Sequence, residues 1–322
     1  DGKAIVLITH KLHEVLSVSD EVAVLRKGKY IGTVKTSEAT AQSLTDMMVG
    51  RAVSLNIDRP DPVDPKPRLK IEGLTCVDNL GVKRLDNVTF TAMSGEILGI
   101  AGIAGSGQRE LLECITGLYP VEHGTVTFLP EGKPAQQLIG KTPNQIRKAG
   151  VAMAFVPEDR LGMGLVGSMG MTDNMMLKSY GEGRSPLVDH RAPRELAEKI
   201  RKELGVVTPG LNTPVSRLSG GNVQKVLVGR ELAASPIVLM TAYAVRGLDI
   251  NTSYTIYNLL NEQKEKGVAV IYVGEDLDVL LELCDRILVL CGGKANGMLD
   301  ARTTTKEEVG LRMTNLVQKE GK

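Results

Sequence analysis

The amino-acid sequence predicts an α/β fold with a mainly parallel sheet that helices cover on both faces. Three observations predict it. Short apolar runs alternate with helical stretches, a glycine-rich turn joins one such run to a helix, and one segment of the chain is repeated. Strands buried on both faces consist of nearly continuous apolar residues, unlike the alternating pattern of a half-exposed strand. With 322 residues, 42% of them hydrophobic, the chain is long enough for about two domains.

The alternation of strands and helices runs through the larger, C-terminal part of the chain. It begins with a predicted strand over 68–74. Strands that alternate with helices form a parallel sheet, because each helix carries the chain back to the start of the next strand. The remaining predicted strands cover 96–101, 151–155, 237–240, 269–273 and 287–290, and the predicted helices cover 108–117, 194–204, 221–234 and 251–266.

The segment 4–29 is repeated as 269–294, without a gap in either copy. Eight of the 26 aligned positions are identical. Each copy predicts a buried strand, a polar turn, a short helix, a second strand and a Gly-Lys hairpin. The repeat predicts a duplicated unit of about 265 residues. Residues 1–58 are then the C-terminal tail of a first unit, residues 68–322 are a whole second unit, and the chain is a fragment of a longer tandem protein.

Residues 59–67 are predicted to link the two units. Four of them are proline, all between positions 60 and 67. Because proline fixes φ and favours extended backbone, we expect this segment to be a semi-rigid spacer.

Composition and charge exclude several classes of function. With 39 basic and 38 acidic residues, the net charge of +1 creates no field that attracts nucleic acid. Aromatic residues are only 3% of the chain and none is Trp, so no nucleic-acid partner is expected. The longest uncharged run, 232–245, is shorter than a bilayer span, and the first residues lack the features of a signal peptide. The four cysteines form no CxxC pair, so we expect them to be reduced and buried in a cytoplasmic protein.

The glycine-rich turn 102–109, Gly-Ile-Ala-Gly-Ser-Gly-Gln-Arg, has the frame of a phosphate-binding loop. It follows a predicted strand and opens a predicted helix, where backbone N–H groups and the helix dipole favour an anion. The usual frame ends in a lysine and a hydroxyl residue, but this chain has Gln108 and Arg109 there. These two cannot replace a phosphate-binding cation and a Mg²⁺ ligand, so phosphate is expected to bind weakly. The candidate nucleotide-binding residues are Gly102, Gly105, Ser106, Gly107, Gln108 and Arg109, and a purely structural turn is the alternative.

A second motif, Leu-Ser-Gly-Gly-Asn-Val-Gln at 218–224, opens the predicted helix 221–234. A serine and two glycines at a helix N-terminus expose several N–H donors to an anion. The same residues also suit an ordinary serine N-cap with a glycine turn. Both interpretations stay open on the residues alone.

Taken in order, these motifs resemble those of ABC transporter ATPases. The segment LSGGNVQK (218–225) is similar to the signature motif of that family. It is followed by an apolar strand and by Arg-Gly-Leu-Asp (246–249), which resemble the Walker B strand and the D-loop. The resemblance covers nearly the whole chain, and it is greatest to the double-ATPase subunits of bacterial sugar and nucleoside importers. The phrases that carry it are ITHKL, LRKGK, MVGR, GEILGIAG, GSGQREL, ITGL and VPEDR.

The resemblance implies a P-loop, ABC-type ATPase domain with a mainly parallel sheet, an antiparallel β subdomain and an α-helical signature subdomain at about 141–234. In this family each ATP site pairs the phosphate loop of one half with the signature motif of the other. The signature motif here would therefore serve a first ATPase half, and His10 resembles the switch histidine of that half. The residues implied for this role in trans are Leu218, Ser219, Gly220, Gly221, Asn222 and Gln224, with Gly247, Leu248 and Asp249 of the D-loop.

The second half's own ATP site departs from the family pattern at several chemical positions. Glu275 stands in place of the switch histidine, and Ala242 and Tyr243 stand in place of the Walker B aspartate and the catalytic glutamate. Neither Ala242 nor Tyr243 can polarise water or bind Mg²⁺. Glu158 stands roughly at the Q-loop glutamine, and no aromatic residue lies between positions 72 and 85 to stack an adenine. The resemblance thus implies no intact catalytic residue, ATP bound weakly or in trans, and Mg²⁺ bound only through the first half.

The resemblance implies three partners: the first ATPase half of the same protein, transmembrane permease subunits and, indirectly, a substrate-binding lipoprotein. It implies a peripheral subunit at the cytoplasmic face of the membrane. Residues 161–176 contain five Met, which predicts either adaptable core packing or a docking socket for a permease helix. Two other functions stay open. One is an atypical NTPase that recruits Arg109 or Glu158, and the other is a docking module that binds no nucleotide.

Overall fold

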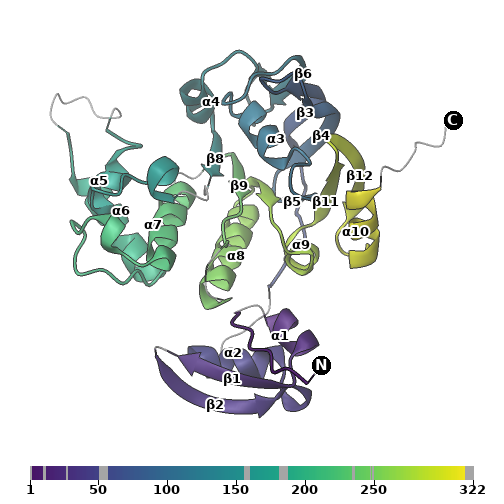
Figure 1. Ribbon diagram of the computed structural model, residues 1–322. Coiled ribbons are helices and arrows are strands. Elements are labelled where there is room, and N and C mark those ends of the chain that lie inside the picture. Colours follow the sequence, from purple (N-terminus) through teal and green to yellow (C-terminus); the bar gives the residue numbers. More distant parts are fainter. Residues whose placement is uncertain are drawn as a thin grey trace.

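The computed structural model describes residues 2–9, 12–26, 28–50, 57–155, 160–180, 188–233, 236–246, 248 and 250–315. They form a main body of sheets and covering helices, a helical lobe at one end, and a small N-terminal unit beside the main body (Figure 1). No helix within these residues is both long and apolar enough to cross a membrane.

The main sheet contains six strands among the described residues. They are β5 (Ile97–Ala101), β8 (Val151–Phe155), β9 (Val238–Ala242), β10 (Ala269–Val273), β11 (Arg286–Cys291) and β12 (Lys294–Asp300). Their order is β12-β11-β5-β10-β9-β8. All neighbours are parallel except β11 and β12, which form an antiparallel hairpin. Every position of β5, β9 and β10 is buried, and the mainly parallel sheet predicted from the sequence is confirmed.

Each face of the main sheet is covered by a hydrophobic core of its own. Successive residues of β5 point to opposite faces, so Ile97 belongs to one core and Leu98 to the other. The first core is shared with helices α7 (Gly220–Leu232), α8 (Ile250–Glu265) and α9 (Leu277–Leu283). The second is shared with helix α3 (Gln108–Ile115) and with a second sheet. All four cysteines are buried and form no disulfide, as expected.

The second sheet is antiparallel and has the order β4-β3-β6-β7. Its strands are β3 (Pro67–Val77), β4 (Lys83–Met93), β6 (His123–Phe128) and β7 (Gln136–Gln137). It corresponds to the antiparallel β subdomain that the family resemblance implies. Helix α4 (Pro143–Ala149) then leads into β8, starting with a Thr142 capping box and ending at a left-handed Gly150.

The helical lobe contains α5 (Met171–Met176), α6 (Arg191–Glu203) and α7, with the short helical turns η2 (Arg160–Gly164) and η3 (Val215–Arg217) (Figure 1). It begins after β8, which lies at the edge of the main sheet. Met171 and Met175 are buried in the first core, so these two of the five methionines serve as core packing.

The N-terminal unit repeats the end of the main body, element by element. Its elements are α1 (Leu12–Val18), β1 (Glu21–Arg26), β2 (Lys29–Lys35), η1 (Thr36–Glu38) and α2 (Ala41–Val49). In the second copy, α1, β1, β2 and α2 correspond to α9, β11, β12 and a final helix α10 (Lys306–Thr314). The two members of each pair have the same length, and they lie at the positions that the gapless alignment of the two copies predicts. Thr40 and Thr305 cap the last helix of each copy by accepting a hydrogen bond from the N–H of the residue three positions on, Ser43 and Glu308. The helix, strand and hairpin predicted for both copies are confirmed, and the structural repeat extends through the following helix.

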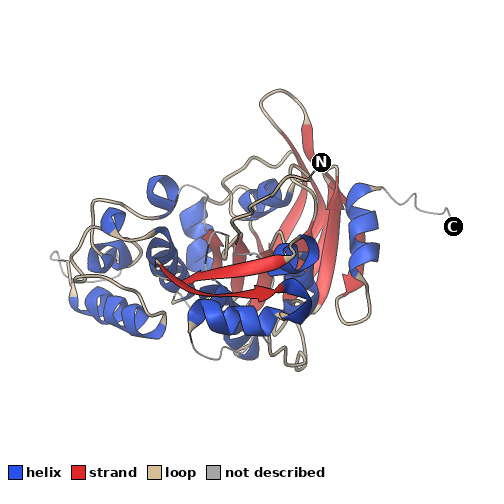
Figure 2. Cartoon of the chain, turned by 60° about the horizontal axis from the view of Figure 1, so that its bottom comes forward, coloured by secondary structure: helices blue, strands red, loops and turns tan. Residues whose placement is uncertain are grey.

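The buried strand predicted over residues 4–8 is not formed, so this prediction was wrong. Residues 2–9 have no regular secondary structure, and Ile5, Val6 and Ile8 are each about 90% exposed. Their counterpart in the second copy, β10, is held between β5 and β9. No described strand lies on either side of residues 4–8 to supply those hydrogen bonds. In Figure 2 the β1–β2 pair lies in front of the main body as a separate two-stranded sheet.

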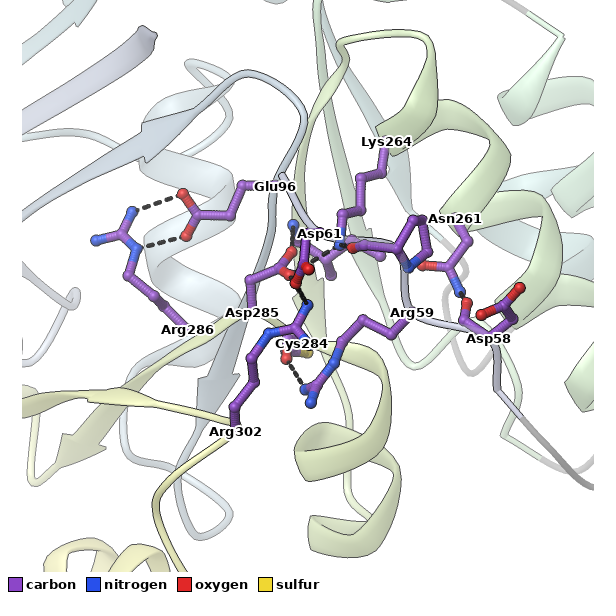
Figure 3. Close-up of polar contacts among 12 residues, drawn as sticks. Asp58, Arg59, Asp61, Glu96, Asn261, Lys264, Cys284, Asp285, Arg286 and Arg302 are labelled. Carbon is purple, nitrogen blue, oxygen red and sulfur yellow. Dashed lines mark hydrogen bonds and ion pairs between the residues drawn. The ribbon is translucent and has the colours of Figure 1, made fainter. Parts of the chain in front are cut away.

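Residues 59 and 60, in the segment predicted to be a linker, are bound to the main body by a buried cluster of charges (Figure 3). Arg59 donates to the carbonyl oxygens of Leu281 and Cys284 at the end of α9. Lys264, on α8, donates to the carbonyl oxygen of Pro60 and pairs with Asp285 at 2.8 Å. This segment is therefore part of the folded body, whereas the sequence predicted only a semi-rigid spacer.

Candidate functional site

The glycine-rich loop 102–107 joins the C-terminal end of β5 to the N-terminus of α3, where the sequence predicted it. Gly105 and Gly107 have φ values of +83° and +97°, a region that favours glycine. A Cβ atom on Gly107 would lie 2.6 Å from the carbonyl oxygen of Arg84. The loop also accepts a hydrogen bond at Ser106 from the N–H of Gly293, in the β11–β12 turn. These contacts hold the backbone in a loop that opens a helix, the arrangement that suits an anion.

Gln108 lies at the end of this loop and points back into it. Its side chain is buried, and Nε2 donates a hydrogen bond to the carbonyl oxygen of Ile103 at 3.2 Å. The amide thus satisfies the loop's own backbone and supplies no positive charge for a phosphate. The loop fits an anion through its N–H groups alone.

Arg109 points away from the loop. Its guanidinium pairs with Glu113, one turn further along α3, with an Nε to Oε1 distance of 2.7 Å. This pair raises the pKa of Arg109, chiefly through the hydrogen bond to Glu113, and the guanidinium stays charged. Glu113 was not among the predicted site residues, although its i, i+4 spacing from Arg109 is the usual signal of such a pair.

The end of β9 carries no group that can bind a metal or act as a base. Ala242 is buried and ends the strand beside Val273 and Phe155. Tyr243 follows with a left-handed φ of +54° and donates its N–H to the carbonyl oxygen of Val273. Burial raises the pKa of the Tyr243 phenol, so it stays protonated at neutral pH.

Mg²⁺ does not fit this site. The metal prefers carboxylate, hydroxyl and phosphate oxygens in octahedral geometry. Here Gln108, Arg109 and Ala242 occupy the positions that would supply the lysine, the hydroxyl and the carboxylate. The described part of the chain also brings together no group of three His, Cys, Asp or Glu side chains suited to a metal ion.

The loop after β10 places Glu275 beside Arg246, with 3.6 Å between Oε1 and Nε. Both side chains are about half exposed, so this contact is a weak surface ion pair. Leu248 is buried in the first core. Four predicted residues lie outside the part of the chain that the structure describes, namely His10, Glu158, Gly247 and Asp249.

The signature residues come together at the N-terminus of α7. Ser219 is the N-cap residue, and Ser219 and Gly220 are exposed. Asn222 donates to Ser219 Oγ at 2.9 Å and accepts from the N–H of Val207 at 3.0 Å. A Cβ atom on Gly221 would meet nothing within 4 Å. The N-terminal end of α7 is therefore presented at the surface, next to open space.

Leu218 and Gln224 bind the N-terminal part of α7 to the interior of the protein. Leu218 packs against the first core. Gln224 is fully buried and donates to the carbonyl oxygen of Ala244, just after β9. The signature helix is thus tied to the end of β9, and Gln224 does not reach the exposed surface on which a ligand would bind.

The segment that contains this candidate site matches a known protein family. Residues 85–241 match the sequence profile of the family described as "ABC transporter". This segment includes the glycine-rich loop 102–107, the helical lobe, the predicted signature residues 218–224 and almost all of β9.

The curated relatives are import ATP-binding proteins. The chain is 35% identical over 319 residues to the glucose import ATP-binding protein TsgD13 of Haloferax volcanii, covering 98% of this chain and 57% of that protein. It is 36% identical over 323 residues to the guanosine import ATP-binding protein NupO of Bacillus subtilis, covering 99% and 62%. It is 34% identical over 316 residues to the nucleoside import ATP-binding protein NupA of Lactococcus lactis, covering 97% and 61%. The chain thus spans about three fifths of the length of these relatives.

Solved structures share the fold. A nucleotide-free ATP-binding cassette from an ABC transporter matches with a TM-score of 0.60 and 24% identity, covering 76% of this chain and 94% of that one. A dimeric bacterial ABC transporter cassette matches with a TM-score of 0.63 and 23% identity, covering 73% and 100%. The chain therefore has the ABC-type ATPase fold, and it is similar in sequence to the ATP-binding proteins of sugar and nucleoside import.

Proposed function

We propose that the chain is part of the ATP-binding subunit of an importer for a sugar or a nucleoside. Residues 1–58 are the C-terminal tail of a first ABC ATPase domain, residues 59–67 are the linker, and residues 68–322 are a second ABC ATPase domain. The structural repeat, in which α1, β1, β2 and α2 match α9, β11, β12 and α10, supports this division. The names of the curated relatives support the class of solute.

The second domain, in this proposal, completes the ATP site of the first domain and hydrolyses no ATP itself. The observation that carries the proposal is the contrast between the two motifs. The signature at Ser219–Asn222 presents a helix N-terminus at the surface, while β9 ends in Ala242, followed by Tyr243, where a metal ligand and a base are needed. Helix N–H groups stabilise a phosphate of ATP without doing chemistry, so this half can assist hydrolysis in trans.

The partners follow from the same proposal. They are the first ATPase domain, the transmembrane permease subunits and, through them, a substrate-binding lipoprotein. The subunit lies peripherally at the cytoplasmic face of the membrane. ATP is bound at the second domain's own loop weakly, through backbone N–H groups, and Mg²⁺ is bound through the first domain.

A second candidate is a docking module that binds no nucleotide with its own loop. The hydrogen bond from Gln108 to Ile103 favours it, because the side chain at the lysine position is bound to the loop's own carbonyl oxygen and carries no charge for a phosphate. The two candidates differ only in nucleotide affinity, since neither hydrolyses ATP.

The trans role is tested by mixing the chain with an ABC cassette from one of its relatives that keeps the phosphate-loop lysine and both carboxylates. We expect the chain to raise ATP hydrolysis by that cassette. The variant Ser219→Glu should abolish the increase, because a carboxylate at the helix N-terminus repels a phosphate. The control Ser216→Glu carries the same charge at an exposed position just before the motif and should keep the increase. An increase that survives Ser219→Glu contradicts the proposal.

A further inference from the structure

A cavity of about 550 Å³ opens in the helical lobe, between α6 and the loop that precedes the signature motif. Its size lies within the range of small-molecule sites. One wall is a single face of α6, which carries Arg194, Glu198 and Arg201 at i, i+4 and i+7. The opposite wall is the loop 209–214 together with Arg217 of η3.

The lining of this cavity carries an excess of positive charge. The lining includes three arginines, Arg194, Arg201 and Arg217, but only one carboxylate, that of Glu198. Glu198 already accepts a hydrogen bond from Arg201 at 2.6 Å. The hydrogen bond from Arg201 lowers the pKa of Glu198, and the charges of Lys202 and Arg194 lower it further. Within the described residues, Arg194 and Arg217 have no carboxylate within ion-pair distance. The lining therefore carries two more positive charges than negative ones, and neither Arg194 nor Arg217 forms a direct ion pair.

One donor in this wall is also left unsatisfied. The Nε atom of Arg201 is buried and makes no hydrogen bond within the structure. Buried donors are usually paired, because leaving one unpaired costs its desolvation free energy. This atom is closed to solvent, so the contacts with an anion in the cavity come from the exposed Arg194 and Arg217.

The loop that forms the second wall is held in place without a ligand. The N–H of Met171 donates to the carbonyl oxygen of Leu211 at 2.7 Å, and the N–H of Val215 donates to that of Met169 at 2.9 Å. Pro209 and Pro214 restrict the backbone at its two ends. A wall that is already ordered lowers the entropy cost of binding.

We propose that this cavity binds a small phosphate ester, with Arg194 and Arg217 holding the phosphate group. Guanidinium groups match phosphate oxygens in planar, bidentate geometry, and a dianion balances the two unpaired charges. The site is separate from the phosphate loop and stands independently of the proposed transport function. Arg217 directly precedes Leu218, and Asn222 accepts from the N–H of Val207, two residues before the lining loop 209–214, so the site adjoins the predicted signature helix.

The test is a calorimetric titration in which inorganic pyrophosphate is added to the variant Gln108→Glu. In this background, the added carboxylate repels anions from the phosphate loop, so that binding there does not contribute. In that background, Arg194→Gln with Arg217→Gln should weaken binding by roughly tenfold or more. The control Arg191→Gln removes an exposed charge from the same helix, outside the cavity, and should change binding by less than about twofold. Glucose 6-phosphate should compete with pyrophosphate, and glucose should not.

Three outcomes overturn the proposal. Saturable binding to the unmodified chain that disappears in the Gln108→Glu background places the only anion site at the phosphate loop. Equal weakening by Arg191→Gln shows attraction by overall charge. A complete lack of saturable binding at about 10 mM pyrophosphate shows that the arginines hold no anion. The single variant Arg217→Gln, at an exposed residue, gives the same readout if the double variant does not fold.

Discussion

Gln108 donates its Nε2 hydrogen to the carbonyl oxygen of Ile103, across 3.2 Å, inside the loop that faces the end of β5. This single contact explains why the loop can keep the frame of a phosphate site while lacking its main attraction for phosphate. The backbone donors of the loop remain, but the cation does not.

Replacing Gln108 with lysine should therefore strengthen ATP binding. A charged hydrogen bond to phosphate contributes about 1.5–3 kcal/mol, so we expect the Kd measured by titration calorimetry to fall roughly tenfold to a hundredfold. ATP hydrolysis should stay at background, because Ala242 still ends β9 and Tyr243 still follows it. An unchanged Kd would support the docking module, in which the loop is a structural turn.

The glycine at position 107 is required by the backbone. We expect Gly107→Ala to lower the free energy of unfolding by about 1–3 kcal/mol, since its φ of +97° strains an L-residue. The new Cβ atom would also meet the carbonyl oxygen of Arg84 at 2.6 Å. Gly221→Ala is the matched control. That glycine is helical with open space around it, so alanine should be neutral or stabilise by up to about 1 kcal/mol. Urea unfolding measures both, and equal effects would refute the assignment of strain.

The repeat supplies a matched pair of apolar positions in different surroundings. Val6 is exposed, while Ile271, its counterpart in the second copy, is fully buried in β10. We expect Val6→Asp to change the free energy of unfolding by less than about 0.5 kcal/mol. Ile271→Asp should cost more than about 4 kcal/mol, because it buries an unpaired charge. A large loss from Val6→Asp would show that residues 4–8 are packed within the chain.

The cluster of charges at the linker should be sensitive to the loss of one partner. Lys264 is 2% exposed and Asp285 is 6% exposed, so Lys264→Met leaves a buried carboxylate without its nearest cation. We expect a loss of about 3–5 kcal/mol in urea unfolding. The pair between Lys66 and Asp64 is exposed, and Lys66→Met should cost less than about 1 kcal/mol. Similar losses from both variants would contradict the buried role of Lys264.

Stability should fall in strong alkali. Burial raises the pKa of Tyr257 above the usual value of 10.0. Above pH 10 the unfolded chain therefore releases the phenol proton while the folded chain keeps it, so the unfolded state binds fewer protons. The contribution of Tyr257 to the free energy of unfolding is complete below pH 10 and is lost as the pH rises towards the pKa of Tyr257 in the folded state. Urea unfolding at pH 8 and pH 10.5 should show this loss, and Tyr257→Phe should reduce it. A loss that is unchanged in Tyr257→Phe would assign the effect to other groups.

The sequence predicts the elements whose own residues decide their structure. The apolar strands of the main sheet, the turn at Gly102–Gly107 and the helix after Ser219 are all where local pattern and turn residues indicate. The alignment of the two copies also predicts that α9, β11 and β12 have earlier counterparts, and they do.

Other features depend on contacts between distant residues, and no local pattern reveals them. Residues 4–8 have the composition of a buried strand, but a strand needs neighbours to accept its hydrogen bonds. Arg59 contacts Leu281 and Lys264 contacts Pro60, and in each pair the two residues are more than 200 positions apart in the sequence. The proline pattern therefore could not predict that this segment is bound to the main body. The direction of the Gln108 side chain likewise follows from the folded loop.

The most direct test of the central claim is the steady-state hydrolysis of Mg-ATP by the purified chain alone. The account predicts no phosphate release above background at any protein concentration, because Ala242 ends β9, Tyr243 follows it, and Arg109 pairs with Glu113. Release that increases in proportion to protein and is lost in Gly107→Ala would contradict it. That result would show that this half hydrolyses ATP with groups other than the usual lysine and carboxylates.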